Sequence, residues 1–268
     1  MSEAISDFDR EQSATKSGSN VVREQVSPQE WQTRQDLAAA YRMVAHYGWD
    51  DMVFTHLSAR VPGPDEHFLL NPFGFLFNEV TASNLVKVDI EGNIVLDNGH
   101  QVNAAGFTIH SAVHMARADA NAVMHLHTDA GVAVSSTKAG LLPLNQHAMF
   151  VYHDTVYHEW EGVALDLDER ERLVNDLGEH HLMILRNHGT LAIGGSIASC
   201  FMRLYYLERA CSIQASATAQ GDLHQPTDQA IEMMRRTFHN PNSWESIAAT
   251  AWPAIRRQAD RLDPSYIN

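Results

Sequence analysis

The sequence has few cysteines, no surplus of basic residues and no long apolar run. Its 268 residues include two cysteines, and 19 Lys and Arg against 33 Asp and Glu give a formal net charge of −14. So few cysteines exclude a disulfide scaffold, and so acidic a chain repels phosphate backbones and anionic lipid. No segment approaches the roughly 18 apolar residues of a membrane span, and the polar N-terminus lacks a secretion signal. We therefore expect a cytoplasmic protein that binds neither nucleic acid nor membranes.

The two cysteines are expected to be free thiols. Cys200 and Cys211 lie in what the pattern predicts to be a single helix. At about 1.5 Å per residue their Cα atoms would be about 16 Å apart, which exceeds disulfide reach. This placement fits a reducing compartment.

Histidine is the residue type in excess, with 16 in the chain. Histidine side chains titrate or bind metals near neutral pH, so this excess needs an explanation. The length and a hydrophobic content of 44% suit one large folded body. We expect a mobile N-terminal tail over 1–26, a folded domain over 27–255 and a C-terminal tail over 256–268.

The pattern predicts alternating strands and helices. Ser27, Pro28 and Glu30 have the spacing of a helix N-cap, N1 and N3, and the helix should end near His46. Several later connections are too short for crossovers, which favours a largely antiparallel or mixed sheet with helices on both faces. Strands are predicted at 54–61, 68–70, 86–88, 94–96, 122–127, 149–151, 182–185 and 190–193, and further helices at 106–117, 130–136, 168–177, 197–217 and 228–237.

Three histidines have the spacing of a metal site. His125 and His127 alternate along an apolar strand, so both imidazoles share one face with Cα atoms about 6.6 Å apart. The pair alone is also compatible with ordinary sheet-surface histidines. His188 can supply a third ligand, because it precedes Gly189 in a tight turn between two strands. Three imidazoles with an open fourth position are typical of a catalytic metal site.

The other histidines carry weaker expectations. His110 and His114 share the spacing of a metalloprotease helix motif, but the position of its glutamate holds Ser111, so they are expected to pack near the site. His147 is left open. The solvated interpretation is favoured for His153, His158, His180 and His181.

Five strings in order resemble the class II aldolase/adducin family, most closely its adducin-head branch. The resemblance spans about 31–216 and implies a three-layer α/β/α fold around a mostly antiparallel sheet. It also implies a homotetramer with small-molecule sites between subunits. The strings are LNPFG at 70–74, EVTAS at 79–83, NAAGFTIHS at 103–111, HLHT at 125–128 and LRNHG at 185–189.

The resemblance also assigns ligands and exposes a departure. His125, His127 and His188 match the family's metal-binding histidines, which implies one divalent ion per chain, zinc first, with manganese or iron as alternatives. The proton-transferring glutamate of the sugar-phosphate aldolases falls on Gly106, and two phosphate-holding serines fall on residues 104 and 105, both alanines. The ordinary aldolase mechanism and a phosphorylated sugar substrate are therefore not supported.

Three residues are candidates to replace the missing carboxylate. His147 follows Pro143 at about the position where the resembling sugar aldolases carry a tyrosine from a neighbouring subunit. Asp129 lies two residues after a predicted ligand, and Glu79 precedes a segment that also suits a helix cap. Thr55 and His56 replace a further pair that the sugar aldolases use near phosphate.

Two function classes remain open. The first is a metal-dependent carbon–carbon lyase, an aldolase or decarboxylase, acting on a carbonyl or carboxylate compound through an enolate-like intermediate. The second is a non-catalytic oligomerisation or binding module like the adducin head. The complete histidine set and the short segment after the last core helix favour the enzyme.

Overall fold

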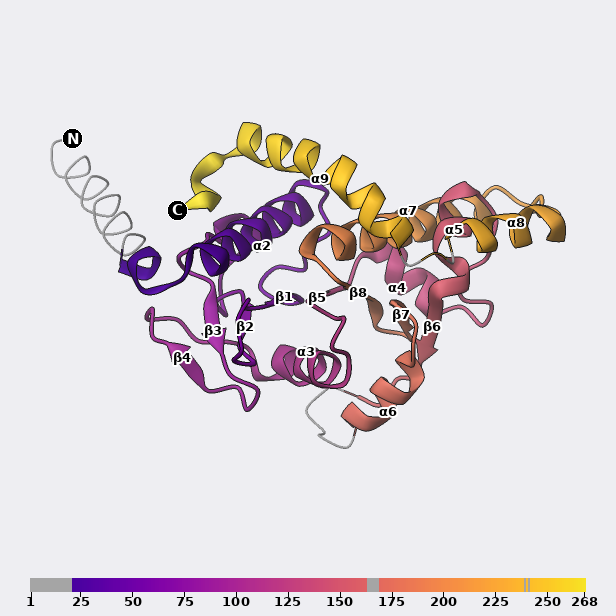
Figure 1. Cartoon of the computed structure of the whole chain (residues 1–268). Coiled ribbons are helices and arrows are strands. Elements are labelled where there is room, and N and C mark those ends of the chain that lie inside the picture. Colours follow the sequence, from indigo (N-terminus) through magenta and orange to yellow (C-terminus); the bar gives the residue numbers. More distant parts are fainter. Residues whose placement is uncertain (1–20, 163–168, 239, 241) are drawn as a thin grey trace, which may run out of the picture.

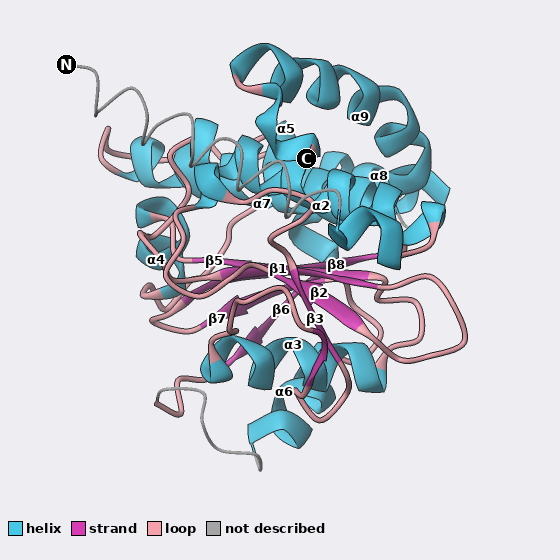
Figure 2. Cartoon of the chain, turned by 90° about the vertical axis from the view of Figure 1, so that its left-hand side faces the viewer, coloured by secondary structure: helices cyan, strands magenta, loops and turns pink. Residues whose placement is uncertain are grey.

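A single eight-stranded sheet lies between two helical layers (Figures 1 and 2). The computed structural model describes residues 21–162, 169–238, 240 and 242–268. The strand order is β4-β3-β2-β1-β5-β8-β7-β6, and every pairing is antiparallel except β6 with β7. The predicted three-layer α/β fold with a mostly antiparallel sheet is confirmed. The strands are β1 His56–Arg60, β2 Phe68–Leu70, β3 Val86–Val88, β4 Ile94–Leu96, β5 Ala122–Leu126, β6 Thr155–His158, β7 Leu182–Leu185 and β8 Gly189–Gly194.

Helices cover both faces of this sheet. Figure 2 shows α3 and α6 on one side and α2, α7 and α9 on the other. Short 3-10 turns occur at η1 Phe77–Glu79, η2 Tyr152–Asp154 and η3 Pro264–Ile267. The helices are α2 Pro28–His46, α3 Ala104–Ala116, α4 Asp129–Ser135, α5 Gln146–Val151, α6 Glu169–Leu177, α7 Ile197–Thr218, α8 Asp228–Phe238 and α9 Asn242–Leu262.

The first long helix forms as its capping residues predict. The Ser27 side chain accepts a hydrogen bond from the Glu30 amide at 3.0 Å, and Pro28 occupies the first helical position. The helix ends at His46, and Gly48 then adopts a φ of +65° that releases the chain toward the sheet.

Side-chain alternation along the central strands decides which face each histidine occupies. In β5, Met124 and Leu126 belong to the apolar core shared with α2 and α7, whereas Val123 packs in the core beneath α3 and α6. Because strand residues alternate, His125 lies on the α3 side with Val123. Leu57 of β1 lies in the α2 core, so Ser58 is likewise on the α3 side.

The segment 149–151 is helical, which corrects the predicted strand. It forms the end of α5, whose N-cap Asn145 accepts a hydrogen bond from the Ala148 amide at 3.0 Å. Ala148 and Val151 are both buried at helical spacing, so a short apolar run that suits a strand instead packs as a helix turn. The strand of this region is β6, which follows η2.

The chain termini also differ from the predicted tails. Helix α9 continues past residue 255, and η3 places Tyr266 in the core with no exposed surface. Backbone amides of Ala82 and Ser83 donate to the carbonyls of Tyr266 and Asn268, both at 2.9 Å, so 256–268 pack on the body. Residues 21–25 are helical, and the earlier part of the predicted N-terminal tail, 1–20, lies outside the described residues.

Two expectations about the cysteines and the membrane can be compared with this fold. Cys200 and Cys211 are both buried free thiols on α7, as predicted. Within the described ranges, no helix has both the length and the apolar character required to cross a bilayer.

Candidate metal centre

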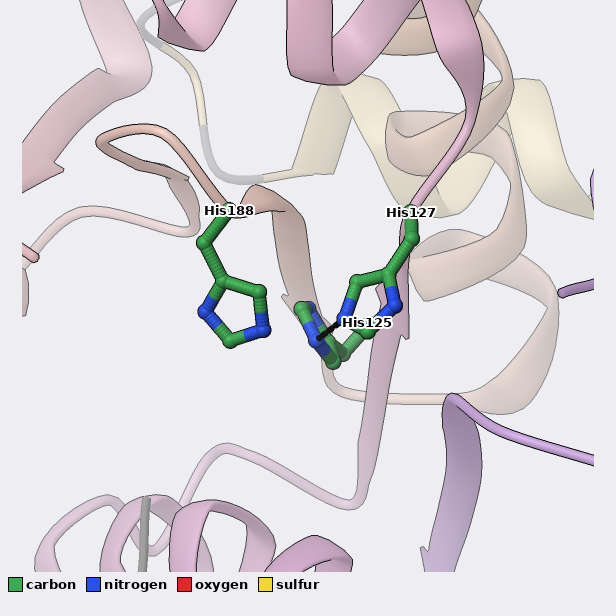
Figure 3. A group of neighbouring side chains, drawn as sticks. All are labelled: His125, His127 and His188. Carbon is green, nitrogen blue, oxygen red and sulfur yellow. Dashed lines mark hydrogen bonds between the residues drawn. The ribbon is translucent and has the colours of Figure 1, made fainter. Parts of the chain in front are cut away.

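His125, His127 and His188 converge at one end of the sheet (Figure 3). One ring nitrogen from each lies within 4.8 Å of the other two. His125 lies in β5, His127 follows the end of that strand, and His188 occupies the turn between β7 and β8. The structure thus brings together the three residues that were predicted as ligands.

The β7–β8 turn is built so that His188 can approach the other two. Asn187 adopts a left-handed φ of +57°, which Asn tolerates better than most residues. Gly189 is required by space, because a Cβ there would lie 2.2 Å from the Leu126 carbonyl oxygen. The start of β8 can therefore press against the end of β5.

The Nδ1 nitrogens of His125 and His127 act as hydrogen-bond donors to the protein. His125 Nδ1 lies 2.9 Å from the Thr190 carbonyl oxygen, and His127 Nδ1 lies 3.0 Å from Asp51 Oδ2. A carbonyl and a carboxylate oxygen accept hydrogen bonds, so each Nδ1 carries the proton and each Nε2 presents a lone pair. The two Nε2 atoms face each other at 2.8 Å. Two lone pairs this close repel unless a cation lies beside both, so the donor set fits a divalent metal ion.

Burial keeps the rings of His125 and His188 neutral. Burial, followed by the neighbouring His188 and His127, holds the pKa of His125 well below its ordinary value. Burial and then the proximity of His127 lower the pKa of His188 to about 4. At neutral pH these two rings are therefore uncharged, which is the state that binds metals.

The centre is partly exposed to solvent. His125 is 4% exposed, but His127 and His188 are only partly buried. The ring of Trp160, itself half exposed, stands 5.3 Å from that of His188. A metal held by the three nitrogens could thus be reached by a small molecule.

The family model of the class II aldolase and adducin N-terminal domain matches residues 35–215. This chain belongs to that family.

Solved and curated relatives of this chain include both aldolases and adducins. An aldolase II superfamily protein from Pseudomonas syringae has a TM-score of 0.89 at 50% identity, covering 92% of this chain and all of that one. An L-fuculose 1-phosphate aldolase from Glaciozyma antarctica has a TM-score of 0.77 at 29% identity, covering 89% of this chain and 92% of that one. Alpha-adducin of Mus musculus is 44% identical over 69% of this chain but only 26% of its own length.

A second histidine group lies under the same face of the sheet. His114 Nδ1 lies 2.8 Å from the Ala120 carbonyl oxygen, so it is the donor nitrogen of that ring. Burial lowers the pKa of His114 to about 3, so its Nε2 is an acceptor and Ser58 Oγ donates to it at 2.7 Å. The same hydroxyl accepts from His110 Nδ1 at 2.6 Å. This chain of bonds fixes both tautomers. His110 lies near the site, since its ring is 6.0 Å from that of His56, which pairs with His125.

The sequence indicated His56 only as half of the pair at the phosphate position, and the structure places it beside His125. This residue of β1 pairs with His125 of β5 and is 6% exposed. Burial, followed by the proximity of His127, lowers its pKa to about 4. The strand alternation that places Ser58 could have placed His56 on the same face.

Asp51 and Glu208 were also missed. Asp51 belongs to a short loop in which Met52 and Thr55 adopt positive φ angles of 54° and 63°. Glu208 lies on α7 and bonds to Thr128 and Thr190. The bonds of Asp51 with His127 and of Glu208 with Thr128 join residues far apart in the chain, and no local sequence pattern predicts them.

The three predicted acid–base residues lie at different places. The Glu79 carboxylate is exposed and accepts from the Leu76 amide at 2.7 Å, so it caps η1. Asp129 is exposed at the start of α4. The His147 ring on α5 lies 5.8 Å from that of Tyr206. The structure does not join these residues to the histidine group. The side-chain surroundings of 104–106, including the Gly106 position, lie outside the described part.

One of the histidines expected at the surface is buried. His158 is 3% exposed on β6, and its Nδ1 lies 2.7 Å from Asp176 Oδ2. Because β6 was not predicted, the solvated interpretation of His158 was wrong. His153, His180 and His181 keep partial or full exposure, in line with that expectation.

Proposed function

We propose that this protein is a metal-dependent carbon–carbon lyase that acts on a small carbonyl or carboxylate compound. The observation that carries the proposal is the pair of facing Nε2 lone pairs of His125 and His127, with His188 beside them. Such a pair is costly in a metal-free protein and favourable around a cation. Membership of a family that includes aldolases supports the carbon–carbon chemistry.

A divalent ion, for which we propose zinc with manganese or iron as alternatives, would act as a Lewis acid on the substrate oxygen and stabilise enolate-like charge. His125, His127 and His188 would hold it. The Thr190 carbonyl and the Asp51 carboxylate orient two of these rings through their Nδ1 protons. The Trp160 ring, 5.3 Å from that of His188, would lie beside the bound ion.

For proton transfer we propose His147 rather than Asp129 or Glu79. Glu79 already caps η1, and Asp129 is exposed in the first turn of α4. His147 would act on the site of a second copy, so this assignment goes with a proposed cytoplasmic homotetramer. Sedimentation of the purified protein tests the tetramer, and a monomer with full activity would contradict the shared site.

Metal content and chelator-sensitive turnover test the proposed function. Elemental analysis of protein expressed with excess metal should give about one ion per chain. A screen of aldol and carboxylate substrates, with and without chelator, should then find activity that the chelator removes and added zinc restores. A metal-free wild type would overturn the metal centre, and bound metal without any chelator-sensitive turnover would overturn the lyase.

A second function is favoured by the likeness to alpha-adducin. The adducin match covers the body of this chain at 44% identity. The alternative proposal is therefore a non-catalytic module that oligomerises or binds a partner. It predicts the metal-bound assembly without turnover, which the same screen detects.

A further inference from the structure

Glu208 is a buried carboxyl group on α7 that lies behind the three histidines. It is 2% exposed. The hydroxyls of Thr128 and Thr190 donate to its two different oxygens. Within the described ranges these two hydroxyls are the side-chain partners that act on its carboxyl group.

Each threonine adjoins a different ligand-bearing segment. Thr128 directly follows His127 and caps α4 by accepting from the Gly131 amide at 2.9 Å. Thr190 is the second residue of β8 after the His188 turn, and its carbonyl oxygen accepts from His125 Nδ1 at 2.9 Å. One carboxyl group therefore connects the segment after the end of β5 with the start of β8.

Burial of the Glu208 carboxyl group lowers the stability of the fold. Burial raises the pKa of Glu208 to about 7, although both hydroxyl bonds act in the opposite direction. Burying a carboxyl group between two hydroxyls costs free energy that a buried Met or Leu would not. A role in geometry accounts for its presence better than a role in stability.

We propose that Glu208 is a positioning residue of the metal centre. It ties Thr128 to Thr190 so that the His127 and His188 segments stay at the separation at which their nitrogens meet. This inference rests on the proposed metal-dependent function, and it adds a residue that does not itself touch the ion.

The experiment compares Glu208→Met with Glu208→Gln and with Gln214→Met. Gln214 is a matched control, because it is also buried on α7 and bridges two groups, the Leu142 amide and the Gly140 carbonyl, that carry no ligand. Zinc affinity is measured by chelator competition. The visible spectrum of the cobalt-loaded protein reports ligand geometry independently of activity.

Glu208→Met should weaken zinc binding about ten-fold and alter the cobalt spectrum, as expected for loss of a group that orients ligands. Glu208→Gln, which can still bond both hydroxyls, should retain most of the affinity, and Gln214→Met all of it. Should Glu208→Met fail to fold, Thr190→Val removes only the β8 bond and should weaken zinc binding several-fold. Unchanged affinity and spectrum in Glu208→Met, or in Thr190→Val, overturn this inference alone. Absence of zinc binding in the wild type overturns it together with the proposed function.

Discussion

Two histidine groups lie on the α3 side of the same sheet and differ in how their nitrogens are used. In the group around Ser58, three of the four ring nitrogens of His110 and His114 bond to a hydroxyl or a carbonyl. In the triad of His125, His127 and His188, the Nδ1 atoms of His125 and His127 bond to protein oxygens, and their Nε2 atoms face each other. In the first group one nitrogen, His110 Nε2, lacks a partner among the described residues, whereas in the second two acceptor nitrogens face each other, an arrangement that suits a cation.

The comparison explains why histidine abundance alone does not locate a site. His110 and His114 have the spacing of a helical metal pair, yet Ser58 fits between them and both are almost fully buried. His125 and His127 have an equally common spacing, but their acceptor nitrogens converge with that of His188. The deciding feature is therefore the partner of each ring nitrogen.

The largest effect should separate the two groups by metal content. His125→Ala and His188→Ala each remove one of three ligands, and we expect either to abolish stoichiometric zinc binding. His114→Gln, which alters the Ser58 group, should leave about one ion per chain. Elemental analysis of the three variants and the wild type measures this directly. Metal retained in His125→Ala, or lost in His114→Gln, would reverse the assignment of the two groups.

The next effect should fall on stability. Ser58→Ala leaves His110 Nδ1 and His114 Nε2 buried without their shared partner, and we expect the free energy of unfolding to drop by about 3 kcal/mol. Urea denaturation of the metal-free protein measures it. Ser111→Ala is the control, because its buried hydroxyl donates only to the Thr108 carbonyl of its own helix. Equal losses in both variants would show that the Ser58 bridge contributes nothing special.

The Ser58 group should also make folding sensitive to acid. The pKa of His114 is about 3 in the folded protein against an ordinary value of 6.5, so the unfolded chain binds the proton more readily. The contribution of the neutral His114 ring to the free energy of unfolding is complete above pH 6.5 and is lost as the pH falls toward 3. Between pH 7 and pH 5 this amounts to about 2 kcal/mol. Urea titrations of the metal-free protein should show a pH dependence that is smaller by that amount in His114→Gln, and an unchanged slope would contradict a neutral buried His114.

The sequence sufficed for the features that depend on local pattern. The Ser27 cap, the end of α2 and the strand alternation of β5 are set by neighbouring residues, and the ordered motifs added the layered fold. The segment 149–151 was misassigned because a short apolar run with buried positions three apart satisfies a strand and a helix turn about equally. Tertiary packing on α7 decides between them.

The convergence of the three histidines was predictable from spacing, but the groups that bond to their rings were not. His127 meets Asp51 across 76 positions of sequence, and Thr128 meets Glu208 across 80. Such pairs are fixed by how strands and helices stack, which no local periodicity encodes. A single sequence can therefore suggest which residues bind a metal, but the hydrogen-bond partners of those residues can be identified only from the fold.

The smallest effect tests whether metal binding by the triad depends on the groups that bond to its Nδ1 atoms, as the comparison implies. Asp51 orients His127 from a partly exposed position, with 45% of its side chain accessible, so its influence should lie at the low end for such residues. Asp51→Ala should weaken zinc binding about ten-fold, and Asp51→Asn, which keeps an acceptor oxygen, by less. Asp50→Ala removes the same charge one position earlier and should leave the affinity unchanged. Chelator competition measures all three. If Asp50→Ala weakens binding as much as Asp51→Ala, then general negative charge near the site, and not the bond to His127 Nδ1, supports the metal.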